Sequence, residues 1–91
     1  NVTTLINVNK LTALQYLDCD DNQLTTLDVT GLSSLQTLYC YYNQLTALPT
    51  LTSKGNIINY NFIDNYFSTE ELDRLRALGF TDESNLLPQN P

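Results

Sequence analysis

The sequence predicts an α+β fold, mostly β, in which the chain coils into a solenoid of about three turns and ends in a C-terminal capping helix. Three observations predict it. Apolar residues recur every 21 or 22 residues, apolar and polar residues alternate within each unit, and the recurrence stops at Phe67, where helix-start signals begin. A recurrence of about 20 to 50 residues is typical of coiled repeats, which bury apolar side chains between adjacent turns.

The repeat unit has apolar residues and one asparagine at fixed places. Its three copies contain Leu14, Leu17, Cys19, Asn22 and Leu24, then Leu35, Leu38, Cys40, Asn43 and Leu45, then Ile57, Tyr60, Phe62, Asn65 and Phe67. The spacing of the first three of these residues also returns ten residues later within the same unit. This nested alternation predicts a strand on each side of the coil, with inward side chains at every second position.

The recurring asparagine has a physical reason. The chain must turn inward after each strand, and this turn leaves backbone groups without a strand partner. A buried amide side chain can satisfy such groups because it both donates and accepts hydrogen bonds. We therefore expect a structural ladder formed by Asn22, Asn43 and Asn65.

A capping helix is predicted over residues 68–80. Ser68 and Glu71 fit a capping box, in which Glu71 reaches back to the Ser68 N–H. The expected apolar stripe toward the last turn consists of Leu72, Leu75 and Leu78, and the residues expected to face water are Asp73, Arg74 and Arg76. Gly79 is placed to end the helix in a left-handed conformation.

These elements divide the chain into three parts. Residues 1–67 hold about three repeat units, of which the first is incomplete, residues 68–80 hold the capping helix, and residues 81–91 are expected to form a tail. From this tail, Leu86 and Leu87 can return to the body. The N-terminal end has no cap, so its edge from Val2 to Val8 is expected to offer unpaired strand groups for a homodimer contact.

The segment from Leu14 to Leu24, read Leu-Gln-Tyr-Leu-Asp-Cys-Asp-Asp-Asn-Gln-Leu, resembles the leucine-rich repeat, and the resemblance covers about residues 3 to 67. The short nested unit resembles a bacterial subclass whose relatives include internalin-like proteins. The resemblance implies a right-handed leucine-rich-repeat solenoid that is not an enzyme and that binds through its concave parallel sheet. It also implies a protein-interaction module of a secreted or surface protein, and therefore an extracellular or cell-surface location.

Charge and hydropathy argue against nucleic acid as a partner and against a membrane span. Ten acidic residues against four basic ones give a net charge of −6, so the chain repels a phosphate backbone and nucleic acid is not an expected partner. No apolar run approaches the roughly 20 residues of a membrane span, and no signal-peptide pattern is present within the sequence.

No catalytic, cofactor-binding or metal-binding residue is predicted. The chain has no histidine, and neither Cys19 nor Cys40 has an adjacent base for nucleophilic catalysis. Their inward positions on neighbouring turns bring the two cysteines within disulfide range, but nearly parallel Cβ directions favour two free thiols. Asp18, Asp20 and Asp21 crowd one turn, yet they lack the glycine turn and the bidentate glutamate of a calcium loop.

The outward face of the strands is the candidate ligand-binding surface. It presents Tyr16, Asp18 and Asp20 from the first unit, Thr37, Tyr39 and Tyr41 from the second, and Asn59, Asn61 and Ile63 from the third. Tyrosine gives broad contact area at low entropic cost, which favours a protein partner. The same aromatic and polar side chains suit a carbohydrate. Two further alternatives are a purely structural spacer and tyrosines that only satisfy β-propensity.

Overall fold

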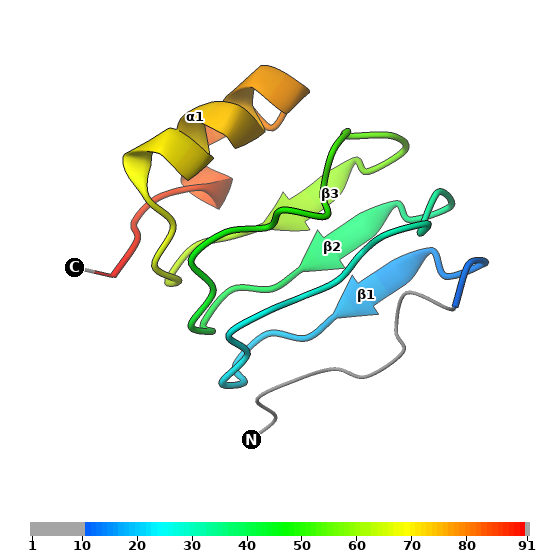
Figure 1. The fold of residues 1–91 in the computed structure, drawn as a ribbon, viewed down its shortest axis with the longest axis horizontal. Coiled ribbons are helices and arrows are strands. Elements are labelled where there is room, and N and C mark those ends of the chain that lie inside the picture. The colour runs from blue at the N-terminus through cyan, green and yellow to red at the C-terminus, as the bar shows by residue number, and fades with distance from the viewer. Residues whose placement is uncertain (1–10, 91) are drawn as a thin grey trace.

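The computed structural model describes residues 11–90, so the edge from Val2 to Val8 and the predicted homodimer contact lie outside the described residues. Figure 1 shows three short strands side by side and a helix beyond the last of them. In chain order the elements are β1 (Tyr16–Asp18), β2 (Thr37–Tyr39), β3 (Asn59–Asn61), α1 (Thr69–Leu78) and the 3₁₀ helix η2 (Glu83–Asn85). The strands are parallel, in the order β1-β2-β3, which confirms the predicted neighbours.

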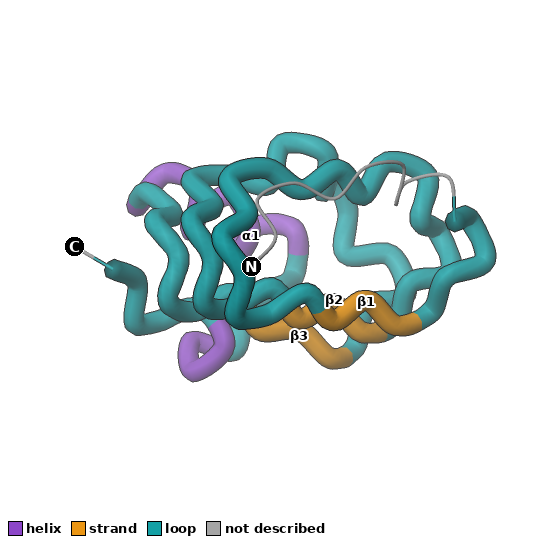
Figure 2. The backbone as a smooth tube through the Cα atoms, turned by 90° about the horizontal axis from the view of Figure 1, so that it is seen from below, coloured by secondary structure: helices purple, strands orange, loops and turns teal. Residues whose placement is uncertain are grey.

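The strands and the segments that return from them enclose one apolar core. The strands lie along one side of the molecule and the return segments along the other (Figure 2). Leu38 on the strand side and Leu45 and Leu48 on the return side are all 0% exposed. Leu27 is buried like Leu48, at the equivalent position one unit earlier. The inward positions predicted from the alternation are therefore core positions, except that Leu14 and Leu17 of the first unit are only partly buried.

The return segments are not strands, which corrects the prediction of a strand on each side of the coil. Residues 24–29 and 45–50 contain no strand; their backbone is irregular, with bends at residues 25 and 46 and a turn at residues 49–50. Side chains make many of the links between units on this wall, because the Val29 N–H donates to Thr50 Oγ1 at 2.9 Å and that hydroxyl donates to the Leu27 carbonyl at 3.3 Å. Alternating burial is kept without a backbone ladder.

Buried asparagine amides join the units, as the sequence predicts. The Leu24 N–H donates to Asn43 Oδ1 at 3.0 Å, and Asn43 Nδ2 donates to the carbonyls of Cys19 and Cys40, each at 3.0 Å. Asn65 makes the equivalent set of bonds one unit later. Each amide thus satisfies groups of its own unit and of the preceding one, so the ladder holds adjacent units in register.

Residues 82–90 form a strap along the last unit, which corrects the expectation of a tail. The Phe62 N–H donates to the Asn85 carbonyl at 2.8 Å, and the Asp64 N–H donates to the Pro88 carbonyl at 2.9 Å. The equivalent N–H groups of the central unit donate to carbonyls of the last unit. The strap therefore supplies the acceptors that a further unit would supply.

Gln89 of the strap takes the place of a further ladder asparagine. Its Oε1 accepts the Phe67 N–H at 3.1 Å, and its Nε2 donates to the carbonyls of Phe62 and Leu86 at 2.8 and 2.7 Å. Leu86 is 0% exposed, so the strap also contributes an apolar side chain to the core. A glutamine side chain thus extends the amide ladder beyond the last asparagine.

Helix α1 begins and ends as its boundary signals predict. Ser68 Oγ accepts the Glu71 N–H at 3.1 Å, and Gly79 adopts the left-handed conformation with φ 116°. Leu72 and Leu75 of this helix are buried in the apolar core. Phe80 then folds back under the helix, where it is 0% exposed. The helix covers the large side chains that the last unit carries.

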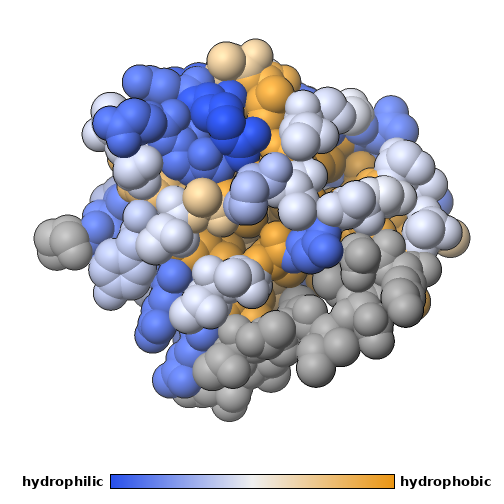
Figure 3. Space-filling model, viewed as in Figure 1, coloured by the Kyte–Doolittle hydropathy of each residue, from blue (hydrophilic) through white to orange (hydrophobic). Residues whose placement is uncertain are grey.

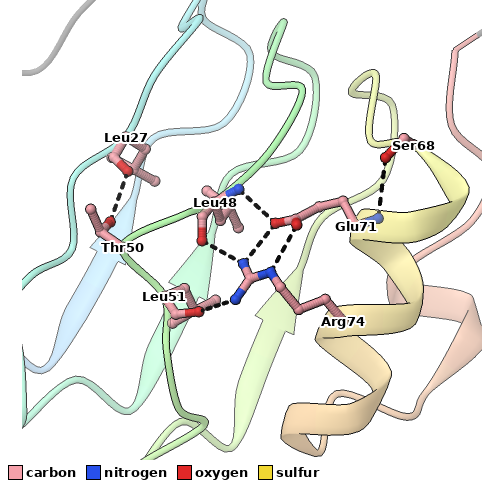
Figure 4. A network of polar contacts seen from close by, with 7 residues as sticks. All are labelled: Leu27, Leu48, Thr50, Leu51, Ser68, Glu71 and Arg74. Carbon is pink, nitrogen blue, oxygen red and sulfur yellow. Dashed lines mark hydrogen bonds and ion pairs between the residues drawn. The ribbon is translucent and has the colours of Figure 1, made fainter.

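The carboxylate and guanidinium of α1 bind the return wall, which corrects two predictions about them (Figure 4). Glu71 does not cap its own helix through its side chain; its Oε2 accepts the Leu48 N–H at 2.8 Å. Arg74 is only partly exposed to water; it donates to the carbonyls of Leu48 and Leu51 at 2.6 and 2.9 Å and pairs with Glu71 at 2.7 Å. The pair thus forms hydrogen bonds with backbone groups of the return segment, as the Thr50 hydroxyl does one unit earlier.

Gln89→Ala should lower the free energy of unfolding by about 1 to 3 kcal/mol, because it leaves the Phe67 N–H and the Phe62 carbonyl without the amide that satisfies them. Denaturant melts monitored by circular dichroism measure the loss. Gln44→Ala is the matched control, since Gln44 is exposed and its change should stay within about 0.5 kcal/mol. Equal losses in the two variants would contradict the ladder role of Gln89.

Glu71→Gln should make stability less dependent on acid. The hydrogen bond from Arg74 lowers the pKa of Glu71 below its usual 4.5, so the stabilisation by this carboxylate is present above that pH and is lost as pH falls through the lower folded-state value. Because the Arg74 side chain is 35% exposed, we expect a loss of only about 1 kcal/mol at pH 7. Melts at pH 7 and in acid should show the difference from the parent chain becoming smaller as the pH falls.

The neighbouring Glu70→Gln serves as the control for this change, because Glu70 is exposed, whereas Glu71 binds Leu48 and Arg74. A Glu71→Gln deficit that persists undiminished at the lower pH would mean that the side chain acts through packing rather than through its charge.

Candidate functional site

The strand register arranges the predicted surface residues in rows. Tyr16 pairs with Thr37 and Thr37 with Asn59, while Asp18 pairs with Tyr39 and Tyr39 with Asn61. The remaining three, Asp20, Tyr41 and Ile63, follow one residue after the inward position of each unit. All of these side chains except Thr37 are exposed or half-buried. One face of the sheet therefore brings together the residues named from the sequence.

Thr37 is the exception, since it is only 6% exposed although its position faces outward. Its two register partners, Tyr16 and Asn59, carry longer side chains, and Asn59 Nδ2 donates to Thr37 Oγ1 at 3.4 Å. The small threonine is covered by its neighbours. It supports the surface without being available for contact, which corrects its assignment as a binding residue.

Four tyrosines make a continuous row of edge-to-face ring contacts, which we call the tyrosine row: Tyr16, Tyr39, Tyr41 and Tyr42. Successive ring centroids are 5.9, 6.4 and 5.9 Å apart, with interplanar angles of 85°, 61° and 64°. Each such pair contributes about 0.5 to 1.5 kcal/mol beyond the area it buries. The contacts orient the rings before any partner binds.

The third ring of the row interacts with an acidic side chain of the first unit. The interaction of the Tyr41 hydroxyl with the Asp20 carboxylate raises the pKa of Tyr41. Partial desolvation and the negative charge of Asp20 act in the same direction. Tyr41 therefore stays protonated and keeps its ring beside an aspartate.

Tyr42 occupies a left-handed backbone conformation with φ 57°, as do Asp21 and Asp64 at the equivalent positions of the other units. Aspartate tolerates this conformation, whereas a bulky L-residue without a compensating local bond costs roughly 1 to 2 kcal/mol there. The Tyr42 side chain is 56% exposed, so core packing does not offset this cost. Strained residues of this kind cluster at functional sites.

A hollow of about 390 Å³ lies beside the row. Its lining combines aromatic, amide and acidic side chains: Tyr39, Tyr41, Ile58, Asn59, Tyr60, Asn61, Asp82 and Asn85. The Tyr60 hydroxyl accepts the Asp82 N–H at 3.0 Å and so ties the strap to the rim of the sheet. The sequence does not predict Asp82 and Asn85 here, because they lie beyond the repeat and no sequence period relates them to the strands.

A second hollow, of about 400 Å³, lies on the return segments and is lined by Thr25, Thr26, Leu27, Asp28, Thr46, Ala47, Pro49 and Thr50. It contains no aromatic side chain. In the face of the molecule that Figure 3 shows, the strongly hydrophilic residues gather mainly over α1. Much of the rest of this face mixes weakly polar and apolar residues. The tyrosine row thus has more of the side chains that recognise partners than this hollow does.

The cysteines are free and buried, as the geometry of the repeat favours. Burial raises the pKa of Cys19 to about 11 and also raises that of Cys40, so both thiols are protonated and unreactive at neutral pH. Within residues 11–90, no cluster of three or more potential metal-ligating side chains is present. No helix in the same range is long and apolar enough to cross a membrane.

Residues 12–53 match the family model described as Leucine Rich repeats (2 copies). The match spans β1, β2 and their return segments, and it supports a leucine-rich-repeat protein. The parallel sheet and the one α-helix found within residues 11–90 fit an α+β fold of the leucine-rich-repeat type. Comparison with curated proteins and with solved structures gave no match. Leucine-rich repeats are commonly protein-interaction modules and are typically not enzymes.

Tyr42→Asn should raise the free energy of unfolding by about 0.5 to 1 kcal/mol, because asparagine adopts the left-handed conformation readily, and removing the exposed ring from beside Tyr41 offsets only part of the gain. Thermal and denaturant melts measure the change. Asp21→Asn is the control, since its φ of 56° is already occupied by a tolerant residue. A destabilised Tyr42→Asn variant would show that the ring contributes more to the fold than its exposure indicates.

Proposed function

We propose that the chain is a protein-interaction module that binds through the outward face of the sheet. The proposal places it in a bacterial surface or secreted protein of the short, nested-repeat subclass with internalin-like relatives, folded as a right-handed solenoid of about three turns. The extracellular or cell-surface location rests on the sequence resemblance to that subclass. The observation that carries the function is the tyrosine row.

The row has the properties of a protein-binding surface. Tyr16 and Tyr42 are each 56% exposed, and Tyr39 and Tyr41 lie half-buried between them. Interfaces concentrate their energy in a few aromatic anchors that are held in place before binding. Ring-to-ring contacts hold these anchors, so little side-chain entropy is lost when a partner covers them.

The shape of the surface favours a macromolecule over a small ligand. The row runs across the open face of the sheet rather than lining an enclosed cavity, whereas pockets for small molecules bury most of their ligand. Contact with a broad face of this kind suits a folded protein or an extended chain segment. A leucine-rich-repeat module presenting four tyrosines therefore favours a protein partner.

Carbohydrate binding is the second candidate, and the hollow beside the row favours it. Tyr39 and Tyr41 line one part of the hollow, and the amides of Asn59 and Asn61 line another. A sugar ring could place its apolar face on a tyrosine and its hydroxyls on the amides. The carboxylate of Asp82 adds a further hydrogen-bond acceptor.

Tyr39→Ala combined with Tyr41→Ala should weaken a partner by about 2 kcal/mol or more, because central aromatic anchors dominate interface energies. The immobilised parent chain would be used to isolate partners from host or sister-cell extracts, and their affinities for each variant would then be measured by surface plasmon resonance. Tyr66→Ala is the matched control, since Tyr66 is 45% exposed but lies outside the row.

Partners whose affinity ignores both central tyrosines would place binding on another face. A glycan array run with the same proteins separates the two candidates. Glycan binding that disappears in the double variant would favour the carbohydrate interpretation, and glycan-independent capture of a protein would favour the first.

A further inference from the structure

The tyrosine row has an acidic flank in the first unit. By the 21-residue offset, the positions of Tyr39, Tyr41 and Tyr42 correspond to those of Asp18, Asp20 and Asp21. The strand register pairs Asp18 with Tyr39, the N–H that follows Asp20 donates to the Tyr41 carbonyl at 3.0 Å, and Asp21 shares the left-handed backbone of Tyr42. Parallel strands lie roughly 4.8 Å apart, so an aspartate neighbours each of these tyrosines.

Acidic side chains also border the row from the other side. Asp64 of the last unit occupies the position of Tyr42 and shares its backbone conformation. Asp82 of the strap lines the hollow beside Tyr39 and Tyr41. The central tyrosines therefore lie between carboxylates contributed by both neighbouring parts of the chain.

No basic side chain among residues 11–90 neutralises these aspartates. Lys54 donates to the Ile57 carbonyl at 2.7 Å. Arg74 pairs with Glu71 at 2.7 Å, and Arg76 pairs with Asp73 and Glu83, each at 2.8 Å. These three are the basic residues in that range. The surface consequently combines exposed rings with a negative potential that is uncompensated within the described chain.

This combination is complementary to cations with an apolar stem. The face of a tyrosine ring is electronegative and attracts ammonium and guanidinium groups, and an adjacent carboxylate adds an ion pair. Tyr39 ends β2 and Tyr41 follows two residues later, and their ring centroids lie 6.4 Å apart. This distance is close to the roughly 6.6 Å interval between alternate side chains of an extended partner. Cationic side chains at alternate positions of an extended segment would therefore match the spacing of Tyr39 and Tyr41.

We infer that the tyrosine row binds an extended protein segment carrying arginine or lysine at alternate positions, an inference that rests on the proposed function. Each cationic side chain lies between a tyrosine ring and the aspartate of the adjoining unit. Arginine suits this arrangement better than lysine, since its planar guanidinium stacks on the ring while donating to the carboxylate. The strong net negative charge of the chain, −6, would also steer such a segment toward it.

The test uses the synthetic peptide Gly-Arg-Gly-Arg-Gly-Arg-Gly, with the glutamate-for-arginine peptide as its charge-reversed control. The ¹⁵N-labelled chain is titrated with each peptide and followed by NMR, which reports affinity and location together. We expect saturable shifts from the arginine peptide over residues 16–21 and 37–42, and none from the glutamate peptide. Raising NaCl from 50 to about 300 mM should weaken binding several-fold.

Two matched double variants separate the flank from overall charge. Asp18→Asn with Asp20→Asn keeps the hydrogen-bond acceptors but removes two charges beside the row, and should weaken the arginine peptide about fivefold or more. Asp28→Asn with Glu70→Gln removes two charges from exposed positions elsewhere and should change it less than about twofold. Tyr39→Leu should weaken the peptide without altering the charge.

Equal effects of the two double variants, shifts spread evenly over the acidic surface, or the absence of saturable binding would each overturn the inference. The proposed function is judged separately. If a captured protein depends on Tyr39 and Tyr41 but is indifferent to Asp18→Asn with Asp20→Asn and to salt, the surface is a binding site whose partner is not basic. If the captured proteins ignore the tyrosines as well, both proposals fail.

Discussion

The buried side-chain amides of Asn43 and Asn65, at two successive inward turns, make the interaction on which the rest of the structure depends. The chain turns where no strand partner can reach its backbone, and in the low dielectric of the core an unsatisfied N–H or carbonyl costs about 1 to 3 kcal/mol. Asn43 answers both needs at once, because its oxygen accepts from Leu24 and its nitrogen donates to Cys19 and Cys40. The same bonds fix the offset between units, and the offset brings the outward tyrosines and aspartates into neighbouring rows.

Periodic features of the fold could be predicted from the sequence, since a residue type that recurs at a fixed offset signals a fixed environment. Leu38, Asn65 and the strand order β1-β2-β3 follow from the period alone. The contacts that end the array could not be predicted, because each is made once. Gln89 has no counterpart in the repeat, and Arg74 has the sequence context of a solvent-facing residue although it bonds the return wall.

The candidate site likewise contains residues that could be predicted from the sequence and residues that could not. Alternation along each strand places Tyr39 and Asp18 on the outward face, and the register confirms that they adjoin. Alternation cannot tell how much of an outward side chain its neighbours cover, which is why it predicts Thr37 on the surface although this residue is buried. It also gives no sign of Asp82, whose position beside the sheet depends on how the strap folds back.

The two ends of the amide ladder differ in kind from its middle, and this difference makes the chain extensible in one place and not in another. The central unit offers the same hydrogen-bonding groups to the unit before it as it receives from the unit after it. A duplicate of residues 35–56 inserted after residue 56 would meet the same hydrogen-bonding groups on both sides as the central unit does now. It would lengthen the sheet by one strand. The last unit cannot be copied in this way, because Tyr60 and Phe62 are matched in size to Phe80 beneath the helix, with ring centroids 4.9 and 5.3 Å from it. A further unit therefore fits in the interior of the array, whereas the terminal unit, helix and strap depend on one another for their packing.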